Sequence, residues 1–273
     1  MAVIPAVPQV RWKVQLTGRS EELQALAKMF GPRGGPPRIR VWFEDERCYL
    51  HAPEFDTMVD MHTVLERGQI LVRRLSGLGR LKFRAFRPVE VGMIVQPTAA
   101  GGSGNTLVLS GDIVLHVPTP ELRAYLDYTP DRPPAMNAVV GPIVAALPPA
   151  EEWVDVADGC TPDVDDALYL LTVGTTSGDW RLLYMVYEII EEHVRDPSKI
   201  ERLGWGTRDE ITRFKDTANS RGALGIKARH GRKKKPHPPN PMTFDEAQEL
   251  VQGLLRAWVR SRAEGTRRAP GAG

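Results

Sequence analysis

The first hundred residues alternate strand-like patterns with turns and helical patterns. Apolar and polar residues alternate strictly from Val10 to Leu16, which is the period of a half-buried strand. Ser20 and the two glutamates after it predict a helix through Phe30, because a Ser cap and early acids suit the amino end of a helix. Residues 39–43 and 47–51 predict the arms of a hairpin around three acidic residues.

The same region contains a longer helical pattern and two further strands. A helix is expected over residues 57–75. Its inward-facing candidates are Val59, Thr63, Leu65 and Ile70. Strand patterns near 89–96 and 106–117 flank a Gly-rich segment, 99–105, which we interpret as a hairpin loop because it opens no helix and lacks a phosphate-binding ending. We therefore predict an α+β domain over residues 1–117, built on a mainly antiparallel sheet with one or two helices.

Beyond residue 117 the pattern changes. Residues 118–162 are rich in proline and short apolar stretches, so we predict a connector that contains the main domain boundary. Residues 163–265 show helical periods of three and four, which predict an all-α four-helix bundle. Residues 266–273 are expected to form a disordered basic tail.

Four helices are expected in this bundle, with a basic connection before the last. The first two cover residues 163–171 and 179–195. Capping boxes, in which a Thr precedes a Glu by three residues, begin the other two helices. These boxes are Thr207 with Glu210 and Thr243 with Glu246.

Composition places the chain among globular proteins, with 42% hydrophobic and 26% charged residues. Cys48 and Cys160 are too few and too far apart for a disulfide framework or a metal cluster, so we expect reduced thiols, no metal and a cytoplasmic location. The longest apolar run beyond the amino terminus, 138–147, is about half the length that spans a bilayer. We therefore expect no membrane segment, and no sequence motif indicates a cofactor.

The net charge of +2 hides an asymmetry along the chain. Residues 200–273 contain 16 Lys plus Arg and 8 Asp plus Glu, a net charge of +8. Subtraction from the totals of 36 and 34 leaves 20 and 26 for residues 1–199, a net charge of −6. A basic carboxy-terminal part favours a polyanionic partner, either RNA or an acidic protein surface.

His230 is the histidine whose neighbours suggest chemistry. Arg229 precedes it and Arg221 lies nine residues earlier, so an acid–base group would lie beside cations that stabilise a phosphate. A helix break at Gly222 or Gly225 would allow Arg221 and His230 to meet. The alternative is structural, with Arg229 and His230 donating hydrogen bonds to the last carbonyls of a helix.

Glu188 is the acidic candidate. It lies between apolar residues in YMVYEII, so it is expected near the bundle centre, where a carboxylate needs a partner such as Arg213 or Arg229. A structural ion pair and a catalytic role both remain open for it.

A basic loop, residues 227–237, is suited to phosphate contacts. Its candidate nucleic-acid-binding residues are Lys227, Arg232, Lys233, Lys234 and Lys235. Flexible cations release condensed counterions when they bind phosphates, but no aromatic residue within the loop suggests base stacking. The alternative for this loop is a solvated basic surface.

The carboxy-terminal hundred residues resemble the HEPN superfamily of helical-bundle nucleases and RNA-binding modules. The resemblance lies in two helices, an Arg-to-His segment ending in RHG, and the capped final helix TFDEAQELVQGLLRAWV. It implies a homodimer, formed through the bundle, in which Arg and His from both copies make one metal-independent RNA-cleaving site. His230 would then assist transfer of the RNA 2′-hydroxyl proton, and Arg221 or Arg229 would stabilise charge at the scissile phosphate. The stretches LLYMVYEII, RFKDTAN and KARHG are also similar to bacterial proteins of unknown function.

Two functional hypotheses follow from the sequence. The first is a bacterial protein that binds RNA or another polyanion, with metal-independent RNA cleavage as its enzymatic form. The second is a noncatalytic interaction module, in which the bundle supplies a dimer interface and the basic loop docks an acidic partner.

Overall fold

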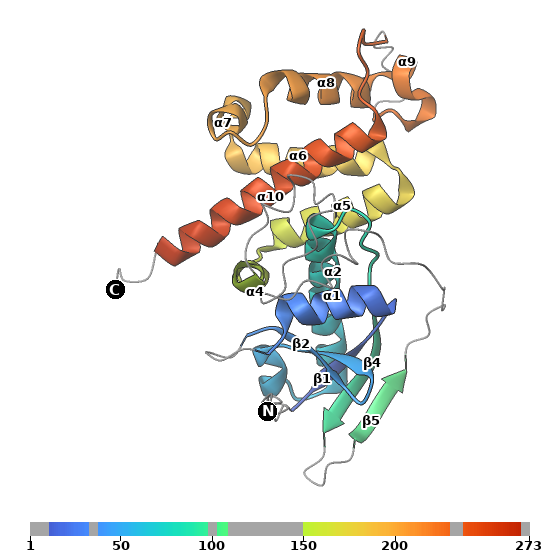
Figure 1. The fold of residues 1–273 in the computed structure, drawn as a ribbon, viewed down its shortest axis with the longest axis vertical. Coiled ribbons are helices and arrows are strands. Elements are labelled where there is room, and N and C mark those ends of the chain that lie inside the picture. Colours follow the sequence, from blue (N-terminus) through green and yellow to red (C-terminus); the bar gives the residue numbers. More distant parts are fainter. Residues whose placement is uncertain (1–10, 33–37, 98–102, 109–149, 230–236, 269–273) are drawn as a thin grey trace, which may run out of the picture. The chain divides into compact units, whose positions relative to one another are not determined.

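The computed structural model describes residues 11–32, 38–97, 103–108, 150–229 and 237–268. The chain divides into two compact units, residues 1–158 and 159–273. The first unit contains a β-sheet with helices, and the described part of the second is helical (Figure 1). The predicted α+β class is therefore confirmed. The division between the units falls inside the predicted connector, residues 118–162, most of which lies outside the described residues.

In the part of the chain that the structure describes, the sheet of the first unit has five antiparallel strands in the order β2-β3-β1-β4-β5. The strands are β1 (Lys13–Thr17), β2 (Arg40–Glu44), β3 (Arg47–His51), β4 (Glu90–Pro97) and β5 (Ser103–Val108). The alternating patterns thus marked the strands well. One difference is that β5 begins at Ser103, inside the segment that we expected to be a loop, and the expected strand residues 109–117 lie outside the described residues.

One face of this sheet is covered by helices. These are α1 (Ser20–Phe30) and α2 (Met61–Lys82), and a short 3-10 helix, η1 (Pro53–Thr57), precedes α2. Val14 and Leu16 of β1 point to this face and are buried. A Cβ atom added to Gly68 of α2 would lie 3.1 Å from Val14, and Cys48, opposite Leu16, approaches the α1 backbone. The small residue at 68 therefore allows α2 to lie close against the central strand.

The register of α2 differs from the prediction. The helix begins after Asp60, whose side chain accepts a hydrogen bond from Thr63 N, and it continues to Lys82. Three of the four predicted inward positions were wrong, since Val59 is 79% exposed, Ile70 is 38% exposed and Thr63 is exposed, whereas Leu65 is half-buried. The buried aliphatic stripe is instead Val64, Leu71, Val72, Leu75, Leu78 and Leu81. This register buries six aliphatic side chains and turns Thr63 toward solvent, so it removes more apolar surface from water.

A helix also occurs in the segment that we expected to be a surface connector. This helix, α4 (Ala150–Asp158), places Trp153, Val156 and Ala157 inward at spacings of three and one. The buried Arg74 of α2 donates a hydrogen bond of 2.6 Å to the Ala157 carbonyl. The Trp153 ring is only 1% exposed, and its burial stabilises the packing of α4, which a surface connector would not have.

The hairpin between β2 and β3 provides a test of local backbone strain. Its two turn residues, Asp45 and Glu46, have positive φ angles of 49° and 62°, a conformation that disfavours side chains with a Cβ atom. We expect Glu46→Gly to stabilise the protein by about 0.5–1 kcal/mol, because glycine adopts this conformation without strain. Urea unfolding of the variant should show a higher midpoint. Asp45→Ala, which keeps a Cβ atom there, should not stabilise the protein.

Within its described residues, the second unit contains the four long helices of the predicted bundle and two short ones. Its helices are α5 (Pro162–Ser177), α6 (Trp180–Val194), α7 (Pro197–Arg202), α8 (Arg208–Asn219), α9 (Arg221–Leu224) and α10 (Phe244–Arg268). Both predicted capping boxes are present, at Thr207 and at Thr243. Helix α10 runs three residues into the segment predicted as a tail, and residues 269–273 lie outside the described part. No described helix is long and apolar enough to cross a membrane.

Aromatic side chains build the core between α6 and α8. The Phe214 ring of α8 lies 6.2 Å from the ring of Trp180, 5.6 Å from that of Tyr184 and 5.7 Å from that of Tyr187. Phe214 and Tyr187 have no exposed surface. Such ring pairs stabilise a core beyond the area they bury. Helix α8 therefore packs tightly against α6, and this packing fixes the start of the chain that follows it.

Candidate functional site

The candidate site is the basic segment between α8 and α10, residues 217–244. These residues include seven Lys or Arg side chains and no Asp or Glu. The segment begins in the last turn of α8 and ends at the first residue of α10. The structure describes its first part, through Arg229, and its last part, from His237.

The described first part ends in a contact with α8 and α6. Arg229 N donates a hydrogen bond of 2.9 Å to the carbonyl of Ala218 in α8. The Arg229 guanidinium pairs with the Glu188 carboxylate and lies over the Tyr184 ring, with Cζ 4.3 Å from the ring centroid. The ion pair and the cation–π contact together hold this arginine against α6.

A helix break lies between α8 and Arg229. Helix α9 contains only four residues, and its amino end is capped by the buried Ser220, whose Oγ accepts a hydrogen bond of 3.2 Å from Ala223 N. It ends at Gly225, where φ is 58°, and a 3-10 turn, η3 (Gly225–Lys227), follows. The break therefore falls at one of the two glycines that the sequence suggested.

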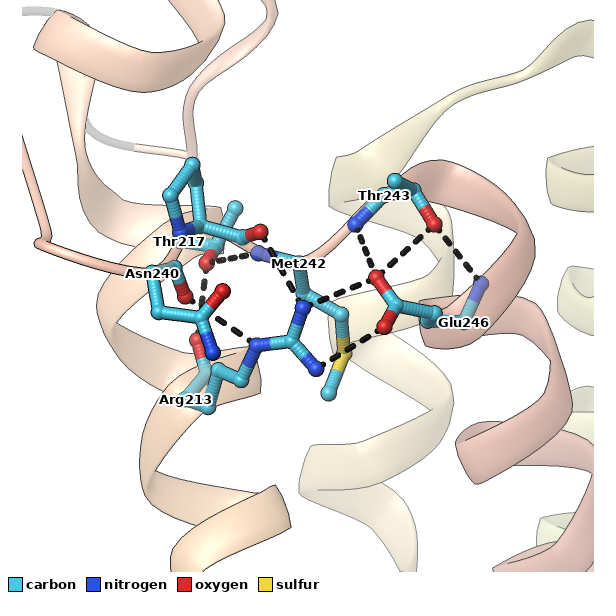
Figure 2. A network of polar contacts seen from close by, with 7 residues as sticks. Arg213, Thr217, Asn240, Met242, Thr243 and Glu246 are labelled. Carbon is cyan, nitrogen blue, oxygen red and sulfur yellow. Dashed lines mark hydrogen bonds and ion pairs between the residues drawn. The ribbon is translucent and has the colours of Figure 1, made fainter.

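The last part of the segment is held by Arg213 of α8 (Figure 2). The Arg213 guanidinium donates to the carbonyls of Asn240 and Pro241, at 3.0 and 3.2 Å. It also forms two hydrogen bonds of 2.9 Å with the Glu246 carboxylate, and Glu246 in turn closes the capping box of α10. The hydrogen bonds from Arg213 lower the pKa of Glu246 to about 2, so this carboxylate stays charged at neutral pH.

Thr217 provides a second attachment for the same part of the chain. Its buried hydroxyl donates to the Arg213 carbonyl at 2.8 Å and accepts a hydrogen bond of 2.9 Å from Met242 N (Figure 2). Arg229 and Met242 thus bind Ala218 and Thr217, which are adjacent in α8. The two attachments therefore bring Arg229 and Met242 to the same turn of α8.

A glycine in α9 allows a third close approach. A Cβ atom added to Gly222 would lie 3.1 Å from the backbone nitrogen of His237 and 3.3 Å from its Cα. A side chain at residue 222 would therefore press on the backbone of the returning chain. His237 itself is exposed and contacts the carbonyl of Pro238.

The structure brings together some of the predicted site residues. Arg229 and Glu188 form the ion pair that was one of the two pairings suggested for Glu188, and Arg213 pairs with Glu246 instead. Arg221 and Lys227 are exposed, at the start of α9 and the end of η3. The remaining candidates, His230, Arg232, Lys233, Lys234 and Lys235, lie outside the described residues. Contact between Arg221 and His230 therefore stays a prediction.

Two of the residues that hold the loop, Thr217 and Tyr184, were not recognised in the sequence. Thr217 had only its place before the basic residues, and Tyr184 only its aromatic character. One signal was available in the sequence. Because residues 217–244 contain no Asp or Glu, any carboxylate that pairs with a cation of this segment must come from another part of the chain. Among the described residues, no group of His, Cys, Asp and Glu side chains could hold a metal ion.

Comparisons with known proteins find no match. No protein family, curated protein or solved structure matches this chain.

Proposed function

We propose that this protein binds RNA through the basic segment of its helical unit. The observation that carries the proposal has two parts. The segment contains seven cations and no acid, and its two described parts are hydrogen-bonded to adjacent residues of α8. Four of these cations, Arg232 and Lys233 to Lys235, lie between the two attachment points in the sequence.

The charge of the segment supports a polyanion as the ligand. Like charges that follow one another repel, and phosphates relieve that repulsion while releasing condensed counterions. RNA is favoured over an acidic protein surface because its phosphates recur at short intervals along a flexible strand that can follow consecutive lysines. The HEPN resemblance supports the same class of ligand.

The attachments support binding through their effect on entropy. A long basic linker loses much conformational freedom when it binds a ligand, and this loss reduces affinity. Here the contacts at Arg229 and Met242 close the loop before any ligand arrives. A loop whose ends are already fixed loses less freedom on binding.

Cleavage of RNA is the enzymatic form of this proposal. Within it, His230 acts as the acid–base group, and Arg221 or Arg229 stabilises charge at the scissile phosphate. Within this proposal, Glu188 positions Arg229 through their ion pair.

Two measurements on one RNA pool test the proposal. The purified protein and His230→Ala are incubated with a mixed RNA pool in EDTA, and binding is measured across a range of salt concentrations. We expect affinity to fall steeply with salt for both proteins, with a slope of about −0.7 for each phosphate contacted on a single strand. Cleavage by the wild type alone would support the ribonuclease form.

Other outcomes count against the proposal. Absence of RNA binding at low salt would reject it, whatever the result for cleavage. Binding with intact RNA in both samples would leave a binding module without catalysis. Tight, salt-insensitive association with an acidic protein, together with weak RNA binding, would favour the interaction module instead.

A further inference from the structure

A pocket lies between α6, α7 and α8 of the helical unit. Its volume is about 570 Å³, and its walls include Tyr187 of α6, Glu201 of α7, and Arg208, Ile211 and Asn219 of α8. Three carboxylates and two cations line it, since Asp196, Asp216 and Lys215 also contribute. This excess of acids disfavours a polyanion, so the pocket is not an extension of the proposed RNA site.

Two charged side chains in this pocket have no partner in the described part of the chain. Lys215 pairs with Glu191 at 2.9 Å, and Asp196 pairs with Arg202 at 2.6 Å. The exposed side chains of Arg208 and Glu201, by contrast, make no hydrogen bond or ion pair with any described residue, including each other. The pocket therefore offers one cation and one carboxylate for a ligand.

The position of Arg208 is not explained by helix stability. It is the first residue of α8, where the helix dipole favours acids and disfavours cations. The two residues that follow, Asp209 and Glu210, are acids, as expected at an amino end. A cation at this place, lining a pocket, is better explained by a negatively charged group that it binds.

A buried polar group in the pocket wall also lacks a partner. Asn219 is 8% exposed, and its amide nitrogen donates to the Lys215 carbonyl at 2.7 Å and to the Tyr184 hydroxyl at 3.4 Å. Its Oδ1 atom is buried without a hydrogen-bond partner. An unsatisfied buried acceptor is costly, and an N–H or O–H group of a ligand in the pocket would satisfy it.

We propose that this pocket binds a small zwitterion, an amino acid with a polar side chain. Its carboxylate pairs with Arg208, its ammonium group pairs with Glu201, and its side-chain N–H or O–H donates to Asn219 Oδ1. Opposite charges on one small molecule match the two unpaired charges of the pocket, whereas a simple anion or cation satisfies only one of them. The pocket volume leaves room for such a side chain.

Isothermal titration calorimetry with L-glutamine as the probe tests this assignment. Butyrate and butylamine, which each carry one of the two charges, serve as ligand controls. We expect glutamine to bind, and we expect Arg208→Gln and Glu201→Gln each to weaken binding by about tenfold or more. Lys199→Gln is the matched control, because Lys199 is exposed on α7 and does not line the pocket. It should leave the affinity unchanged.

Three results would overturn the assignment. These are no detectable binding of glutamine at millimolar concentration, binding that neither pocket variant weakens, and binding of butyrate or butylamine as tight as that of glutamine. None of them bears on the RNA proposal, which rests on other residues.

Discussion

Replacing Lys233, Lys234 and Lys235 with glutamine should weaken RNA binding roughly fifty-fold at physiological salt and make the salt slope shallower by about 2. The reason is counterion release, in which each phosphate contacted on a single strand contributes about 0.7 to the slope, so three lost contacts remove most of three such contributions. The measurement is fluorescence anisotropy of a labelled RNA from the bound pool, titrated at several salt concentrations. Replacement of the same residues with arginine should restore both affinity and slope, because the charge is retained.

A matched triple variant separates local contacts from net charge. Arg181→Gln, Lys199→Gln and Arg202→Gln remove the same charge from exposed positions on α6 and α7 of the same unit. We expect this control to lower affinity only slightly, since screening weakens charges that do not touch the RNA. Equal losses in the two triple variants would reject the basic loop as the binding site and assign the effect to overall charge.

Local features of the fold could be predicted from the sequence because they depend on nearby residues. The capping box at Thr207 involves Glu210, three residues away, and the box at Thr243 involves Glu246 in the same way. A glycine break before His230 was predictable for the same reason, since Gly225 acts through its own backbone. Such features require no knowledge of what packs against them.

The contacts that hold the basic loop could be predicted only in part, because they depend on packing between distant helices. Glu188 had two candidate partners, and the choice depends on which arginine the fold brings to α6. Arg213 is 33 residues from Glu246, and only the approach of α8 to the start of α10 pairs them. Most inward-facing residues of α2 were predicted wrongly for a similar reason. The face of the helix that turns inward depends on the sheet against which it packs.

Thr217→Val should destabilise the helical unit by about 1–3 kcal/mol, because the variant leaves a buried Met242 N–H without an acceptor. Valine has nearly the shape of threonine, so the change creates little cavity and the expected effect comes from the lost hydroxyl. Urea unfolding should show a lower midpoint for the variant. Native-state hydrogen exchange should show faster exchange of the Met242 amide, since its acceptor is the hydroxyl of Thr217.

The control for this prediction is the same substitution on the same helix. Thr212 is exposed on α8, so Thr212→Val should change the free energy of unfolding by less than about 0.5 kcal/mol. If Thr217→Val proved equally harmless and Met242 exchanged at its wild-type rate, the hydroxyl would not hold the returning chain. If Met242 exchanged faster and RNA affinity also fell, the attachment at Thr217 would act in binding, because a loop freed at one end loses more entropy when the RNA orders it.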